Sequence, residues 1–126
     1  MMTNLVAKAV LDLSILSEMY GDDSVETVCP VLVGFRNEAH LYIGQLQHAL
    51  SVLDSVEIAR LSHSLKTMSG LIGAGQLMTL CQRTEQAARQ NNHLSLKACE
   101  HDLTLAWPAL LSQLQNSLQQ CGYDDV

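Results

Sequence analysis

Apolar positions recur every three or four residues along most of this chain, which is the period of an amphipathic helix. Between residues 55 and 72 they fall at Ile58, Leu61, Leu65, Met68 and Ile72. At about 100° per residue, these five positions lie within a sector of roughly 80°. The spacing predicts a helix from Ser55 to about Ile72. Asp54 is its expected N-cap, and Glu57 completes a capping-box-like pair.

The same period predicts four more helices. A short first helix ends near Tyr20 and begins near Thr3 or near Asp12. The others cover about residues 25–50, 74–90 and, from 93 or 95, to 120. Their expected core positions are Val28, Leu32, Phe35, Ala39, Tyr42, Leu46 and Ala49; then Leu77, Leu80, Cys81, Thr84 and Ala88; then Leu96, Cys99, Leu103, Ala106, Leu110, Leu114 and Leu118. Pro108 is expected to kink the last helix, because it removes a backbone donor.

Four long amphipathic helices with short connections predict an all-α fold. The architecture we expect is an antiparallel up-down-up-down four-helix bundle with an additional short N-terminal helix. A chain of 126 residues is expected to form a single domain over residues 1–126. Its hydrophobic content of 48% is enough for a core, and an aromatic content of only 4% favours helices over sheet.

The net charge of −6 argues against a nucleic-acid partner, because such binding depends on Lys and Arg neutralising phosphates. Lys8 and Asp12 interrupt the apolar N-terminus, so no signal peptide is predicted. Residues 103–123 carry no charge, but glutamines, asparagine and serine interrupt them, so no membrane span is expected. Cys81 and Cys99 fall on apolar helical phases and are expected to be buried free thiols, which makes a reducing cytoplasm the default location.

His63 lies about 180° from the middle of the apolar stripe of the 55–72 helix. Small or cationic side chains surround it on this face: Ala59, Arg60, Lys66, Thr67 and Gly70. Such a face suits an imidazole that contacts another protein and carries an anion. The alternative is that His63 is an ordinary solvated surface histidine.

Gly70 argues against that alternative. A glycine inside a helix costs about 1 kcal/mol relative to alanine, so it usually has a packing or access reason. By phase Gly70 lies on the face of His63, and we expect it to leave room for a partner.

A longer pattern surrounds this histidine. It consists of His63-Ser64-Leu65-Lys66, Ser69-Gly70, Gly73-Ala74, Leu77, Cys81, Glu85 and Arg89, with Leu11-Asp12, Gly21-Asp22-Asp23 and Phe35 upstream. With these residues at these spacings, the chain resembles the histidine phosphotransfer (HPt) domain family over about residues 11–120. The position after Lys66 is commonly glycine in that family and is Thr67 here. Many relatives have glutamine in place of Glu85.

The resemblance implies a cytoplasmic phosphorelay intermediate. His63 would be its phosphoacceptor, and we expect it to be the only one because of its exposed setting among the five histidines. It would accept a phosphoryl group from an aspartyl phosphate on the receiver domain of a hybrid sensor histidine kinase. It would then pass the group to the aspartate of a response regulator. The chain would be a monomeric phosphohistidine carrier without ATP-driven kinase activity of its own.

The side chains near His63 suggest how transfer would be assisted. Glu85, at the border of its helix's apolar stripe, is the candidate to hold the Nδ1 proton of His63. Lys66 would neutralise the phosphoryl group, and Thr67 would donate its hydroxyl to the same oxygens. Arg89 would anchor Glu85 or contact the partner, and Arg60 would face the partner.

No metal site or cofactor is predicted. His40 and His48 are eight residues apart, as are His93 and His101, and neither pair has the one-turn spacing of helical metal ligands. The resemblance implies that Mg²⁺ comes from the partner receiver domain. Two other functions stay open: a helical adaptor or inhibitor of a two-component system that needs no His63, and the dimerising helices of a histidine kinase.

Overall fold

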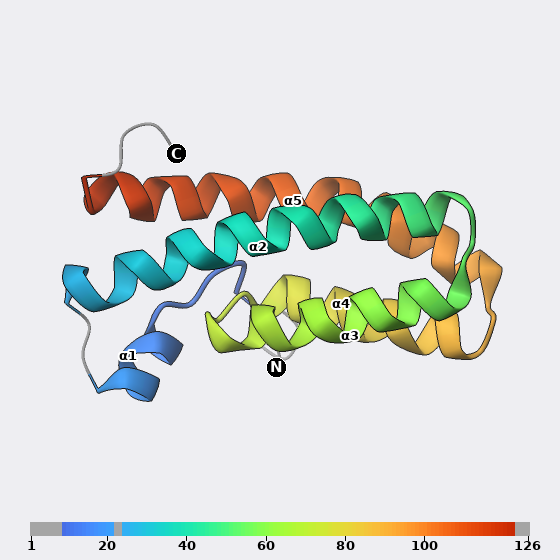
Figure 1. Ribbon diagram of the computed structural model, residues 1–126, viewed down its shortest axis with the longest axis horizontal. Coiled ribbons are helices and arrows are strands. Elements are labelled where there is room, and N and C mark those ends of the chain that lie inside the picture. Colours follow the sequence, from blue (N-terminus) through green and yellow to red (C-terminus); the bar gives the residue numbers. More distant parts are fainter. Residues whose placement is uncertain (1–8, 22–23, 123–126) are drawn as a thin grey trace, which may run out of the picture.

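Helices make up nearly all of the described chain, which in the computed structural model comprises residues 9–21 and 24–122 (Figure 1). They are α1 (Ser14–Tyr20), α2 (Val25–Ser51), α3 (Ser55–Leu71), α4 (Gly75–Arg89) and α5 (His93–Gln120). The predicted ranges of the four long helices are confirmed to within one residue at each end. For α1 the start near Asp12 is the correct alternative, whereas Thr3 lies outside the described residues.

The four long helices contact one another in a closed ring. α2 packs on α3 and α5, and α4 packs on the same two helices. Short connections make consecutive helices antiparallel, and Figure 1 shows them side by side with α1 beneath the first half of α2. The predicted up-down-up-down bundle with a short extra helix is confirmed. None of the described helices has the length and hydropathy that a bilayer-spanning segment needs.

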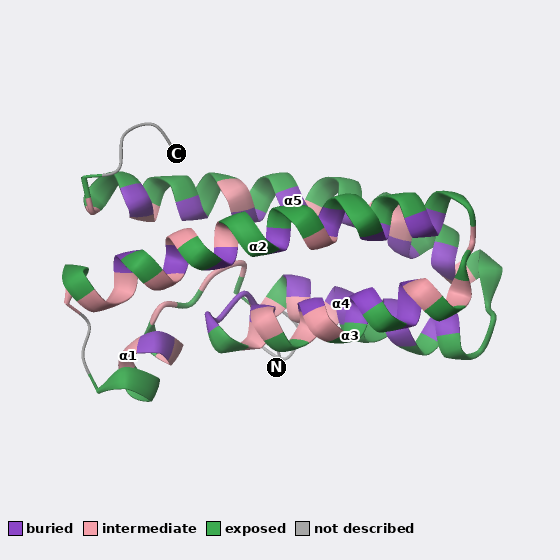
Figure 2. Ribbon diagram, viewed as in Figure 1, coloured by how far each residue is buried: buried purple, intermediate pink, exposed green. Residues whose placement is uncertain are grey.

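The buried faces point into the ring (Figure 2), and the predicted core is largely correct. Every expected core residue of α4 is buried. In α2 five of the seven expected core residues are buried, together with Cys29, Ile43 and Leu50, whereas the predicted Val28 and Tyr42 are only partly buried. Trp107 likewise takes the buried place expected for Ala106. Adjacent positions on a helix point about 100° apart, so a buried face rotated by about half that angle from the predicted one exchanges one position for the other.

Met68 of the predicted 55–72 stripe is partly buried, while Ile58, Leu61, Leu65 and Ile72 are buried. The Asp54 side chain accepts a hydrogen bond from Glu57 N at 3.3 Å and caps α3 as predicted. α5 is one helix that includes Pro108, which lies on its exposed side.

The turn between α3 and α4 is held by residues that precede α1. Asp12 N donates to Gly73 O at 2.9 Å, and Gln76 N donates to Ala9 O at 3.0 Å. Gly73 has φ +78°, and a Cβ there would collide with the carbonyl oxygen of Asp12. Only glycine combines this left-handed conformation with so close a backbone approach. The C-terminal end of α3 is therefore fixed in place.

Cys29 in α2 and Cys121, directly after α5, form a disulfide with a Cα–Cα distance of 6.3 Å. This pairing was not predicted, because the two cysteines are 92 residues apart in the chain. The first turns of α2 and the last turns of α5 extend past the end of α3 (Figure 1), and the disulfide joins them there. Cys81 and Cys99 are buried free thiols, as predicted.

Candidate functional site

His63 projects from the middle of α3, and 60% of its side chain is exposed. Its Nδ1 atom lies 3.1 Å from Oε2 of Glu85, which comes from α4. The two residues meet because α3 and α4 are consecutive antiparallel helices that pack along their length. One ring nitrogen is thus held by the protein, while the ring remains open to solvent.

Glu85 is the centre of a small ionic cluster. Only 10% of its side chain is exposed, and its Oε1 atom accepts a hydrogen bond from Lys66 Nζ at 2.9 Å. Oε2 accepts a second bond from Arg89 Nη2 at 2.7 Å, one helical turn further along α4. Two cations therefore balance one carboxylate directly beside the imidazole of His63, which leaves the cluster with a positive charge that favours an incoming anion.

The cluster determines the ionisation of Glu85. Burial alone would raise the pKa of its carboxyl, but the hydrogen bonds from Lys66 and Arg89 outweigh this and lower the pKa to about 2. Glu85 is therefore a carboxylate at neutral pH. An ionised oxygen accepts the Nδ1 proton of His63, so the neutral ring has its lone pair on Nε2.

Arg60 and Thr67 are exposed, as predicted, but each has a partner within α3. Arg60 Nε donates to Glu57 Oε1 at 2.9 Å. Thr67 Oγ1 donates to the carbonyl oxygen of His63 at 3.3 Å. The prediction that Ala59 faces solvent is wrong, because α4 packs against that side of α3 and leaves Ala59 only 9% exposed.

Gly70 is less open than its helical phase suggested. It is half-buried, and a Cβ there would lie 3.1 Å from Sδ of Met78 in α4. The expectation that Gly70 simply clears space for a partner needs correction. Part of its role is to let α4 approach α3, and the phase argument missed this because it considers one helix alone.

A hollow opens beside His63 between α3 and the end of α4. Its lining consists of Ser55, Val56, Ala59, Arg60, His63, Ser64, Ala88, Arg89 and Asn91. Val56, which is 82% exposed, was not predicted as a site residue. The sequence could have identified Val56, because it is an apolar residue two helical turns before His63 on the same exposed face of the helix. Val56 and Arg89 therefore line the same hollow as the His63 imidazole.

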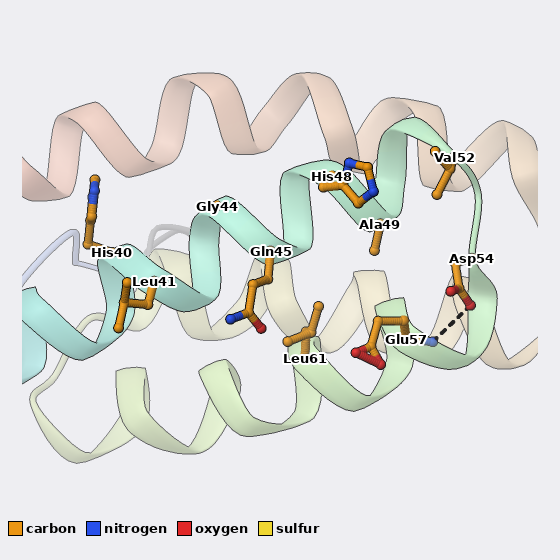
Figure 3. A pocket seen from close by; sticks show the side chains of 10 residues that line it. All are labelled: His40, Leu41, Gly44, Gln45, His48, Ala49, Val52, Asp54, Glu57 and Leu61. Atoms are coloured by element: carbon orange, nitrogen blue, oxygen red, sulfur yellow. Dashed lines mark hydrogen bonds between the residues drawn. The ribbon is translucent and has the colours of Figure 1, made fainter.

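Exposure does not distinguish His63 from the other histidines, contrary to expectation, because all five are exposed. Figure 3 shows His40 and His48 on α2 along a second groove, separated by Gly44. In the described part of the chain, His63 is the histidine whose ring nitrogen lies within ion-pairing distance of a carboxylate. Nor do the described residues include three His, Cys, Asp or Glu side chains grouped to hold a metal ion.

Comparisons with known proteins identify the family of this chain. The Hpt domain family model matches residues 31–120. Histidine-containing phosphotransfer protein 2 of Arabidopsis thaliana is 25% identical over 104 residues, which cover 80% of this chain and 67% of the plant protein. No solved structure gives a significant match. Because the family model covers most of the chain, the protein belongs to the Hpt domain family, with a phosphorelay histidine phosphotransfer role and receiver domains as its general kind of partner.

Proposed function

We propose that His63 is the phosphoacceptor of this protein and that it carries a phosphoryl group between two receiver domains. The donor is an aspartyl phosphate on the receiver of a hybrid sensor histidine kinase, and the final acceptor is the aspartate of a response regulator. The observation that supports this best is the 3.1 Å contact of His63 Nδ1 with the buried carboxylate of Glu85, on a ring that is 60% exposed.

The contact suits His63 to nucleophilic attack. With the proton held on Nδ1, the Nε2 lone pair attacks the phosphorus atom of the aspartyl phosphate. A bond forms between Nε2 and phosphorus as the bond to the aspartyl oxygen breaks, and the aspartate leaves as a carboxylate. Transfer to the response regulator reverses these steps with a second aspartate as the nucleophile.

The neighbours of His63 would then serve the transferred group. Lys66 and Arg89 together exceed the charge of Glu85, so their surplus attracts the phosphoryl oxygens. The Lys66 ammonium is a compact charge on a flexible stem, which lets it bind Glu85 and a phosphoryl oxygen together. Thr67 lies one turn from His63 and can turn its hydroxyl from the His63 carbonyl to the same oxygens.

The receiver would dock over the hollow beside His63. Val56 offers an apolar contact there, while Arg60 and Arg89 offer charges to an acidic active-site rim. The proposal assigns the Mg²⁺ ion that assists transfer to the receiver domain. It further holds that the protein works in the cytoplasm, as a monomer, without an ATP-driven kinase activity of its own.

The test is incubation with a receiver domain carrying labelled aspartyl phosphate. Wild-type protein should acquire label that is acid-labile and alkali-stable. H63Q should keep the helical circular dichroism of the wild type and acquire no label, whereas the exposed control H101Q should be labelled normally. Label on H63Q would overturn the assignment. A wild-type chain that binds receivers but takes no label would instead indicate a helical adaptor.

A further inference from the structure

The disulfide between Cys29 and Cys121 lies where α2 and α5 extend past the end of α3, and the proposed phosphotransfer at His63 does not use it. We propose that Cys29 and Cys121 are a reversible thiol–disulfide pair that exchanges with a low-molecular-weight thiol of the glutathione class. The inference rests on the proposed cytoplasmic location, because disulfides that form in a reducing compartment are usually transient or redox-sensing. The residues that carry it are all outside the cluster of His63.

The geometry allows the bond without distorting the bundle. The Cα atoms of Cys29 and Cys121 are 6.3 Å apart, within the usual range for disulfides. The helices they join are already packed together through buried leucines, among them Leu32 of α2 and Leu118 of α5. This packing does not depend on the bond, so the reduced protein is expected to stay folded.

The surroundings of Cys121 also suit its reduced form, the free thiol. Cys121 Sγ lies 3.3 Å from the carbonyl oxygen of Ser117, one turn earlier in α5. A thiol at this position can donate to that oxygen from the side-chain position that the disulfide uses. Both redox states of Cys121 are therefore compatible with the same end of α5.

The two sulfurs differ in access, which gives exchange a direction. Cys29 is only 2% exposed, whereas Cys121 follows the last turn of α5 and is partly exposed. A glutathione thiolate attacks Sγ of Cys121, and Cys29 leaves as a thiolate. A second glutathione thiolate attacks the glutathione sulfur of the mixed disulfide, and Cys121 leaves as a thiolate. The net reaction converts the protein disulfide and two thiols into a protein dithiol and one glutathione disulfide, and oxidation is its reverse.

The other cysteines do not compete in this exchange. Burial raises the pKa of the Cys81 thiol to about 12, so it carries almost no thiolate at neutral pH. Cys99 is buried as well. Exchange is thus directed to one pair, and Cys81 and Cys99 serve as controls within the same chain.

The experiment equilibrates the full chain in mixtures of reduced and oxidised glutathione, quenches it in acid, and alkylates it under denaturing conditions. Peptide mass spectrometry should show Cys29 and Cys121 changing together from unmodified to alkylated as the reduced form increases. Cys81 and Cys99 should be alkylated throughout. The oxidised protein should melt at least about 5 °C above the reduced one, and C121S should lose this difference.

Two results would overturn the proposal: free Cys29 and Cys121 in every mixture, or a disulfide that persists in the largest excess of reduced glutathione. A Tm difference that remains in C121S would do the same. His63 labelling is measured on both redox forms and on C121S. If the pair titrates but no form is labelled, the proposed function fails and the redox site stands. If labelling is normal but the pair does not titrate, the reverse holds.

Discussion

Glu85 Oε2 and His63 Nδ1 lie 3.1 Å apart across the interface of α3 and α4. The carboxylate is mostly buried and the imidazole is mostly exposed, so the pair connects the interior of the bundle to its surface. Glu85 is held in turn by Lys66 and Arg89, which fixes the direction of its oxygens. The orientation of the His63 ring is therefore set by side chains of α3 and α4 before any partner binds.

Replacing the Glu85 carboxylate tests whether transfer requires its hydrogen bond to His63 or its negative charge. E85Q should retain most transfer, because an amide oxygen still accepts the Nδ1 proton of His63. E85A should slow transfer by about tenfold to a hundredfold, the kinetic equivalent of losing one charge-assisted hydrogen bond. Single-turnover transfer from a labelled receiver measures both. Complete inactivity of E85Q would mean that the charge itself is required.

Lowering the pH should reduce the free energy of unfolding, because Glu85 becomes protonated. The pKa of Glu85 is about 2 in the folded protein against 4.5 for a free glutamate, so folding favours the ionised form. Its contribution of about 1–3 kcal/mol is present above pH 4.5 and is lost as the pH falls towards 2. Urea unfolding between pH 7 and pH 2 should show the wild type losing its advantage over E85Q in this window. A constant difference between the two proteins would contradict the assignment.

Removing the Lys66 ammonium should slow transfer or shorten the lifetime of the phosphohistidine, because a nearby cation that neutralises the phosphoryl oxygens is lost. K97A is a matched control, since Lys97 forms an exposed ion pair with Glu100 on α5. The decay of labelled protein after removal of the donor measures the lifetime, and the transfer time course measures the rate. Equal behaviour of K66A and K97A in both would rule out a role for Lys66.

The change in stability on substituting Gly70 should depend on its neighbour Met78 in α4. Alanine at an open helical glycine stabilises by up to about 1 kcal/mol, and G44A should show this because a Cβ there meets nothing within 4 Å. G70A should gain less, since Met78 must shift to make room. In an M78A background the gain from G70A should recover. Denaturant unfolding of the four proteins in this cycle measures the coupling, and strict additivity would argue against the contact.

Crowding at the docking surface is tested separately. G70Q places a longer side chain on the face of His63 where the receiver is proposed to dock, and it should reduce transfer. M78A, which leaves this surface open, is the comparison for any effect of altered α3–α4 packing. Unchanged transfer in G70Q would leave only the packing role for Gly70.

Helical periodicity predicted the helices, their ends and the inward face of α4, because these depend on residues close in sequence. It also placed Glu85 near enough to α3 to be a partner of His63. It failed where a neighbouring helix decides the outcome. Ala59 is buried by α4, and Ile43 is buried in place of Tyr42 because packing against α3 and α5 sets which face of α2 is covered. The Cys29–Cys121 pair depends on how α2 and α5 meet, which no local pattern contains.

The groups that hold His63 all come from α3 and α4, two helices joined by a turn of three residues, Ile72–Ala74. Only 22 residues separate His63 from Glu85, so closing this part of the chain loses little conformational entropy. The geometry around the proposed phosphoacceptor is thus encoded in one helical hairpin. Sequence changes elsewhere in the bundle can alter the lifetime of the folded state while leaving Nε2 of His63 where it is.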